Sequence, residues 1–137
     1  MKNDVIVGLG SNIDALIHIE KAVQLIEKEA ENGATELKRA RIVETTPLGF
    51  KDQANFFNSA IRFKTVLDPK ALKNRLLEIE NALGRVRTNN KNGPRTIDLD
   101  ILVWNGEIVD YDVAERDFLQ EAIEALQPGL IRKLIEK

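Results

Sequence analysis

The 137-residue chain contains no cysteine and only one histidine, His18. The missing thiols exclude a disulfide framework, a cysteine nucleophile, and zinc or iron–sulfur sites held by cysteine. A single histidine also excludes a multi-histidine metal site, and any serine–histidine–aspartate arrangement would have to use His18. Charge chemistry must therefore rest on aspartate, glutamate, lysine and arginine, which suit oxyanions and hard cations such as Mg²⁺.

Long hydrophobic runs are also missing. No stretch approaches the about 18 apolar residues of a membrane span, and the apolar run that begins at Val5 is too short for a signal-peptide core. These absences predict a cytoplasmic protein with no membrane partner. Lys and Arg number 20 against 22 Asp and Glu, so the net charge of -2 argues against an electrostatic grip of the whole protein on nucleic acid.

The length and composition indicate one ordinary domain. The 137 residues are close to the prior of about 150 residues per domain. Apolar residues make up 43% of the chain and charged residues 31%, with no internal repeat or low-complexity tract. We therefore predict a single domain over residues 1–137, acting as a monomer or a weak homodimer.

Hydrophobic periodicity and turn residues predict the order strand, helix, strand, strand, helix, strand, followed by a hairpin and a helical tail. The predicted strands span residues 5–9, 35–46, 55–66, 95–104 and 107–109, and the predicted helices run from 11 or 12 to 32, from 68 to 83 and from 118 to 134. This βαββαβ order predicts an α+β, ferredoxin-like sandwich: a mainly antiparallel sheet with helices on one face, plus the C-terminal hairpin and tail.

Local signals set the ends of these elements. Gly8-Leu9-Gly10 predicts a turn after the first strand, and Ser11 or Asn12 is expected to cap the helix that follows. Asp68-Pro69 is typical of a helix start, and Asn105-Gly106 of a tight hairpin. The buried stripe of the first helix is predicted to consist of Leu16, Ile19, Val23 and Ile26.

The most informative segment is the strand that carries Asp98 and Asp100. Side chains two apart on a strand point the same way, so both carboxylates share one face. Their apolar neighbours are expected to face the core: Ile97, Leu99, Ile101 and Val103. Adjacent carboxylates repel each other unless a cation lies beside them, and oxygen ligands favour Mg²⁺. The alternative is two solvated acids on a sheet face.

Basic residues crowd the approach to this pair: Arg85, Arg87, Lys91 and Arg95. Guanidinium groups bind phosphate oxygens in a two-pronged manner. Any one of these arginines is best interpreted as half of a surface ion pair. Together with two carboxylates and a predicted mobile loop over 85–94, they indicate phosphoryl transfer, in which metals bridge phosphates and cations absorb charge.

Phe56 and Asn58 form a third group on one face of a predicted strand. A flat aromatic ring beside a carboxamide can stack on a heteroaromatic ring and bind its edge. Spacing alone favours a core phenylalanine and a satisfied asparagine. Phe56, Phe57 and Phe63 could instead stack RNA bases on a sheet, but the chain lacks the basic and aromatic RNA-reading motif.

Several motifs occur together in one order. They are Gly10-Ser11-Asn12, Thr45-Thr46-Pro47-Leu48-Gly49, the segment 52–58, Gly84-Arg85-Val86-Arg87 and Gly93-Pro94-Arg95-Thr96-Ile97-Asp98-Leu99-Asp100. As an ordered set they resemble the 6-hydroxymethyl-7,8-dihydropterin pyrophosphokinase family of folate biosynthesis, from the first strand to about Trp104. The resemblance implies the same ferredoxin-like fold and transfer of the terminal pyrophosphate of ATP to the pterin hydroxymethyl oxygen, giving AMP.

The resemblance also implies roles for individual residues. Asp98 and Asp100 would hold two Mg²⁺ ions against the phosphates of ATP, with Arg85 and Arg95 stabilising the transferring group. Further ATP contacts would come from Arg87, Ile101 and Arg116. The pterin would be bound by Thr45, Pro47, Leu48, Phe56, Asn58 and Phe118.

The last third departs from the family pattern. Relatives carry a proline–histidine pair before an arginine-x-phenylalanine, whereas Asp110-Tyr111 stands where that histidine would fall. Arg116-Asp117-Phe118 matches the second motif, with Phe118 as a second aromatic plate for the pterin. Two hypotheses follow besides an RNA-binding module: an active, trimmed pyrophosphokinase, or a degenerate relative that binds pterin or nucleotide without efficient transfer.

Overall fold

Six strands from the described part of the chain form one sheet whose strand pairs are all antiparallel. The structure is a computed structural model that describes residues 2–28, 35–47, 52–85 and 94–135. The strands are β1 (Asn3–Ser11), β2 (Thr35–Arg39), β3 (Val43–Thr45), β4 (Phe56–Thr65), β5 (Asp98–Trp104) and β6 (Glu107–Ile108). The helices are α1 (Ala15–Lys28), α2 (Pro69–Ala82), the 3₁₀-helix η2 (Tyr111–Glu115), α3 (Asp117–Leu126) and α4 (Leu130–Ile135).

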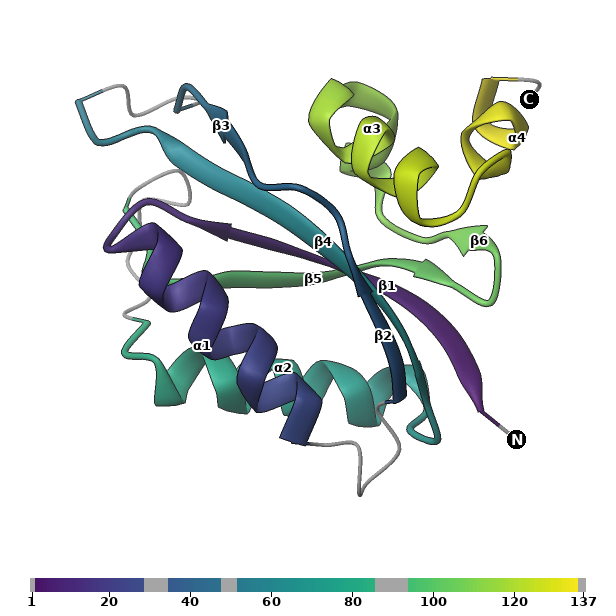
Figure 1. Ribbon diagram of the computed structural model, residues 1–137, viewed down its shortest axis with the longest axis horizontal. Coiled ribbons are helices and arrows are strands. Elements are labelled where there is room, and N and C mark those ends of the chain that lie inside the picture. Colours follow the sequence, from purple (N-terminus) through teal and green to yellow (C-terminus); the bar gives the residue numbers. More distant parts are fainter. Residues whose placement is uncertain (1, 29–34, 48–51, 86–93, 136–137) are drawn as a thin grey trace.

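The strand order confirms the predicted ferredoxin-like arrangement. The strand order in the sheet is β2-β4-β1-β5-β6 (Figure 1). Strand β3 pairs with the first residues of β4, and β2 pairs with later residues of the same strand. The two central strands, β1 and β4, are paired from Asn3 with Thr65 to Ser11 with Phe57. These two strands therefore form the frame from which the other elements are placed.

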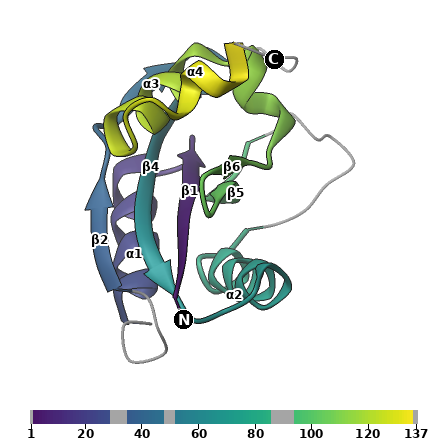
Figure 2. The ribbon, with the colours of Figure 1, turned by 90° about the vertical axis from the view of Figure 1, so that its right-hand side faces the viewer.

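Each face of the sheet covers its own hydrophobic core. The first core lies between the sheet and helices α1 and α2, and includes Val5, Val7, Ile61 and Phe63. The second lies on the other face, where Ile6 and Ala60 pack against η2, α3 and α4. Figure 2 shows these two groups of helices on different sides of the strands. The C-terminal tail thus completes a third layer.

The start of the chain differs from the prediction at two points. Gly8 and Gly10 make no turn, because β1 continues through them to Ser11. Helix α1 begins only at Ala15, so the predicted cap at Ser11 or Asn12 is wrong, and Leu16 is 57% exposed rather than buried. Ala22 joins Ile19, Val23 and Ile26 in the buried stripe, whereas Leu16 lies in the first turn of the helix.

Two strands also differ from the prediction. The strand expected over 35–46 is divided into β2 and β3, and the register of β2 against β4 shifts between Thr35 and Lys38. Strand β5 starts at Asp98 and carries a bulge, since Ile6 pairs with Val103 but Val7 pairs with Ile101. The extra residue turns Val103 to the second core, so its predicted position beside Leu99 is wrong.

The remaining turn and cap signals are confirmed. The Asp68 carboxylate accepts a hydrogen bond from the backbone N–H of Ala71 at 2.8 Å, with Pro69 opening α2. Asn105 and Gly106 both have positive φ, 48° and 83°, as a tight hairpin with a primed turn requires. The helix predicted from 118 to 134 is divided into α3 and α4, with Gly129 at a positive φ of 91° between them.

One ion pair ties the N-terminal strand to the C-terminal layer. Arg62 on β4 donates hydrogen bonds to both carboxylate oxygens of Asp4, at 3.0 and 2.6 Å, and a third to the carbonyl of Leu126 at 2.8 Å. The Arg62 guanidinium holds the pKa of Asp4 below its usual range, chiefly by these hydrogen bonds. The pair therefore links β1, β4 and the end of α3.

Replacing Asp4 by asparagine tests this link. Because the folded pKa of Asp4 lies below the unfolded value, its stabilisation is complete above about pH 4 and is lost as pH falls through the folded pKa. We expect Asp4→Asn to lower the free energy of unfolding by about 1 kcal/mol at pH 7. Urea titrations at pH 7 and pH 3 should show the difference between the two proteins shrinking at the lower pH. Glu20→Gln, which removes a solvent-exposed pair with Arg39, is the control and should cause no measurable change; an equal loss in both variants would contradict the account.

Candidate active site

Two glycines open a hollow across the middle of the sheet. Gly10 on β1 pairs with Asn58 on one side and with Asp98 on the other, and Gly8 pairs with Ala60 and Asp100 in the same way. Paired residues of neighbouring strands point to the same face. Without a side chain at Gly10, the space between Asn58 and Asp98 stays empty, and a Cβ there would lie 3.3 Å from Asn58 Oδ1. Gly8 and Gly10, which the sequence predicted to lie in a turn, therefore form the floor of a site.

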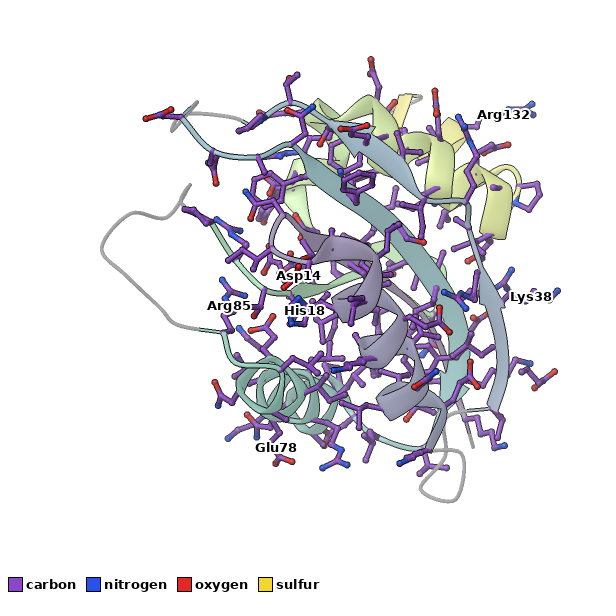
Figure 3. The ribbon with its side chains drawn as sticks, turned by 60° about the vertical axis from the view of Figure 1, so that its left-hand side comes forward. Asp14, His18, Lys38, Glu78, Arg85 and Arg132 are labelled. Carbon is purple, nitrogen blue, oxygen red and sulfur yellow. The ribbon has the colours of Figure 1, made fainter. Side chains whose placement is uncertain are left out.

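The Asp98 carboxylate is held by two arginines. Arg85 donates to Oδ1 at 2.8 Å and Arg95 to Oδ2 at 2.9 Å. All three side chains are largely buried, with 26%, 14% and 21% of Asp98, Arg85 and Arg95 exposed. Arg85 projects from the end of α2 (Figure 3). Asp98, the first residue of β5, thus holds both Arg85, which lies 13 residues before it in the sequence, and Arg95, which lies 3 residues before it.

A buried glutamate supports Arg85 from below. Glu80 on α2 is 2% exposed, and its Oε1 lies 3.0 Å from Arg85 Nη1. Its other oxygen accepts a hydrogen bond from the backbone N–H of Leu99 at 2.7 Å. Glu80 therefore joins the end of α2 to the start of β5 and sets the position of the Arg85 guanidinium. The sequence analysis missed this residue, because nothing in a helical repeat marks a glutamate for burial.

Asn12 performs a similar role for Arg95. Its side-chain oxygen accepts a hydrogen bond from the Arg95 backbone N–H at 2.9 Å, and its own backbone N–H donates to the Arg95 carbonyl at 3.2 Å. The Asn12 amide also donates to Gln53 Oε1 and to the Ala54 carbonyl. Instead of capping α1, Asn12 joins the segments that precede β4 and β5.

Asp100 has a strongly perturbed carboxyl group. The residue keeps contact with solvent, but surrounding protein atoms displace water from its carboxyl group. This desolvation, reinforced by the negative charges of Asp98, Asp110 and Glu80, raises the pKa of Asp100 to about 7. The prediction that Asp98 and Asp100 share one face is confirmed, since both line one hollow of about 120 Å³. A cation at this point would relieve the repulsion.

The neighbouring hollow, of about 110 Å³, has an aromatic and amide lining. Phe56 and Asn58 contribute to it from β4, together with Phe118 from the start of α3. Asn58 donates to Thr45 Oγ1 at 2.8 Å, which fixes the orientation of the carboxamide. The Arg95 guanidinium lies 5.7 Å from the centre of the Phe56 ring. The two hollows share Gly10, Asn58, Arg95, Asp98, Arg116 and Phe118, so they form one continuous site.

Comparison with known proteins identifies this combination. Residues 6–128 match the family model described as 7,8-dihydro-6-hydroxymethylpterin-pyrophosphokinase (HPPK). The chain belongs to the HPPK family.

Individual relatives agree with this assignment. The chain is 43% identical over 111 residues to the 2-amino-4-hydroxy-6-hydroxymethyldihydropteridine pyrophosphokinase of Bacillus subtilis, an alignment that covers 80% of this chain and 65% of that protein. It is 31% identical over 142 residues to the protein of the same name from Aquifex aeolicus, covering 97% and 86%. It is 34% identical over 135 residues to the folic acid synthesis protein fol1 of Pneumocystis carinii, covering 93% and 18%. The chain thus spans less than two thirds of the first and third of these relatives.

The HPPK motif residues fall into three sets in this structure. Asp98, Asp100, Arg85 and Arg95 meet at the start of β5, with Thr45, Phe56, Asn58, Arg116 and Phe118 beside them. Ile101 and Pro47 lie apart from these two hollows: Ile101 lines a third one, of about 390 Å³, with Lys73 and Asp110, and Pro47 is buried beside Thr46. Leu48 and Arg87 lie outside the described residues.

Thr46 and Asp110 line the hollows although neither was singled out as a site residue. The Asp110 carboxylate accepts a hydrogen bond from the backbone N–H of Asp112 at 2.8 Å. His18 is a half-buried residue of α1 near Asp14, which precedes the helix (Figure 3), and its ring contacts the Ile13 carbonyl rather than the site. None of the described helices is long and apolar enough to cross a bilayer.

The donor atoms fit a hard divalent cation. Asp98 and Asp100 offer carboxylate oxygens on one face, and a bound cation would offset both the desolvation and the acidic neighbours that raise the pKa of Asp100. Within the described ranges, no three acidic or histidine side chains converge as a complete metal cage. Such an open pair suits Mg²⁺, which keeps several water molecules and takes other ligands from substrate phosphates.

Glu80→Ala tests the support of Arg85. The substitution leaves the Leu99 N–H without its side-chain partner and removes one of the two carboxylates that hold the Arg85 guanidinium, so we expect a loss of about 3 kcal/mol in the free energy of unfolding. Urea denaturation measures the change. Glu78→Ala, which removes an exposed ion pair with Arg75 on the same helix, is the matched control and should stay within about 0.5 kcal/mol of wild type. Similar losses in the two variants would show that burial of Glu80 has no special role.

Proposed function

We propose that this protein transfers pyrophosphate from ATP to the hydroxymethyl group of 6-hydroxymethyl-7,8-dihydropterin, releasing AMP, as a step of folate biosynthesis. The observation that supports this most is the Asp98 carboxylate between Arg85 and Arg95, at 2.8 and 2.9 Å, beside Asp100 and continuous with an aromatic hollow. One site thus offers phosphate-binding, cation-binding and ring-binding groups within a single surface.

The ring-binding half suits a pterin. Phe56 and Phe118 come from different layers of the fold and line the same hollow, as two plates for one flat heterocycle would. The Asn58 carboxamide and the Thr45 hydroxyl present donors and acceptors for the edge of that ring. Backbone groups near Pro47 and Leu48 complete the proposed pterin edge contacts.

The charged half suits the triphosphate of ATP. We assign Mg²⁺ to Asp98 and Asp100; two such ions, when held there, would neutralise charge on the phosphates. Arg85 and Arg95 already donate hydrogen bonds to Asp98 at this position. They can therefore donate to phosphate oxygens instead without a large movement of their side chains. Arg116 lies in both hollows, and with Ile101 and Arg87 it is proposed to bind the nucleotide.

The reaction needs positioning more than a strong base. The pterin hydroxyl oxygen forms a bond to the β-phosphorus of ATP, the bond from that phosphorus to the α–β bridging oxygen breaks, and AMP leaves. Alignment of the two substrates can lower the barrier by about 7–11 kcal/mol. The hydroxyl proton passes late to a carboxylate or to water. In this scheme the arginines hold the transferring group and the aromatic plates hold its acceptor.

The degenerate-binder hypothesis is favoured by one observation. Asp110 stands where the family pattern has a histidine, and its negative charge adds to that of Asp98 around Asp100. This charge would weaken nucleotide binding in the absence of a cation. A cytoplasmic location and a monomeric or weakly dimeric state remain predictions from the sequence.

Incubation of the full chain with ATP, Mg²⁺ and 6-hydroxymethyl-7,8-dihydropterin decides between the two hypotheses. We expect AMP to form only when the pterin is present. We expect Asp98→Asn to lower kcat by at least about a hundredfold, because it removes charge where cations and phosphate must be aligned. AMP is measured by chromatography and the fold by circular dichroism.

Asp68→Asn is the control, because asparagine also caps a helix and Asp68 lies outside the hollows described above. Its rate should match that of the wild type. Tight pterin binding by calorimetry without AMP would establish the degenerate binder, and an unchanged rate in Asp98→Asn would refute the proposed role of that carboxylate.

A further inference from the structure

A separate cavity of about 250 Å³ lies between α3 and the segment that joins β2 to β3. We call it the α3 cavity; its walls include Ala40, Val43, Ser59, Leu119, Ala122 and Ala125. It shares Asn58 and Phe118 with the aromatic hollow and Leu119 with the hollow of Asp98 and Asp100, and its other lining residues lie outside both hollows. Its volume approaches the lower end of the range for small-molecule sites, about 300 Å³.

The cavity is open because small side chains face one another across a fixed floor. Ala40 lies opposite Ala122 and Ala125 of α3, so neither wall fills the space. The floor is held by backbone and side-chain bonds, since the Ala40 N–H donates to the Ala60 carbonyl at 2.9 Å and Ser59 Oγ donates to the Ala40 carbonyl at 3.0 Å. A ligand would therefore enter a preformed, mainly apolar space.

Three charged side chains line the cavity, namely Arg39, Arg41 and Glu121. Arg39 is paired with Glu20 at 2.8 Å, whereas Arg41 contacts Glu121 only at 3.6 Å, with both of the latter side chains largely exposed. An exposed pair at that distance contributes little, so Arg41 can exchange Glu121 for an anionic group of a ligand. Glu121 also lines the cavity, so a cationic ligand would have to displace Arg41 from it.

We infer that the α3 cavity is a second small-molecule site, selective for an apolar body that carries a carboxylate, and that its occupancy alters binding at the aromatic hollow. The coupling follows from the shared residues: a ligand in the cavity packs on Phe118 and Asn58 from behind and restricts their side chains. The binding itself stands on the geometry of the cavity, whereas the coupling to pterin rests on the proposed function.

Calorimetry with 2-naphthoate and its uncharged analogue 2-naphthamide tests the site. We expect 2-naphthoate to bind the wild type about threefold more tightly than 2-naphthamide, and Arg41→Gln to remove this preference. We expect Ala122→Leu, which fills the cavity, to weaken 2-naphthoate binding by at least about tenfold. Ala82→Leu places the same change on exposed α2 and should leave the affinity unchanged.

Thermal unfolding checks that the variants are folded, and Ala125→Leu at the cavity edge gives a second filled variant if Ala122→Leu is unstable. Failure of 2-naphthoate to bind, or equal affinity in wild type and the folded filled variants, would overturn the inference. Pterin titration with and without saturating 2-naphthoate then measures the coupling, with a change of about threefold or more expected. If 2-naphthoate binds but pterin does not bind at all, the proposed function fails and the second site stands.

Discussion

The site depends on one carboxylate that satisfies two guanidinium groups. Asp98 is the first residue of β5, and its two oxygens are divided between Arg85 and Arg95. The same carboxylate therefore holds Arg85, which follows α2, and Arg95, which precedes β5. Two partly buried positive charges so close together would repel strongly without Asp98, and Glu80 adds a second negative charge beneath Arg85. The arginines are therefore held in place for a polyanion before one arrives.

The layers of the fold explain why these charges meet an aromatic hollow. The first core fixes β1, β4 and β5 against α1 and α2, which sets Gly10 between Asn58 and Asp98. The second core places α3 across the other face, and this brings Phe118 over the glycine floor. The C-terminal tail thus contributes one wall of the site as well as a hydrophobic layer.

Local rules predicted much of the fold and the centre of the site. Alternation along a strand placed Asp98 and Asp100 on one face, and Asp68-Pro69 and Asn105-Gly106 marked a helix start and a hairpin. The incorrect predictions concern residues whose position depends on contacts with distant parts of the chain. The bulge at Leu102 depends on the pairing of β5 with β1, and Asn12 bonds to distant segments instead of capping α1. Burial of Glu80 depends on Arg85 and the Leu99 N–H, which no helical periodicity reveals.

The central claim is that Asp98 and Asp100 together bind a divalent cation with a nucleotide. The most direct test is ¹³C NMR titration of the aspartate carboxyl groups, with Asp98→Asn and Asp100→Asn used for assignment. Without ligands, Asp100 should titrate near pH 7, as its desolvation and acidic neighbours require. With Mg²⁺ and a non-hydrolysable ATP analogue, we predict that the pKa of Asp100 falls by more than about one unit, because a bound cation favours the charged carboxylate. An Asp100 pKa that stays near 7 under saturating Mg²⁺ and analogue would contradict the account.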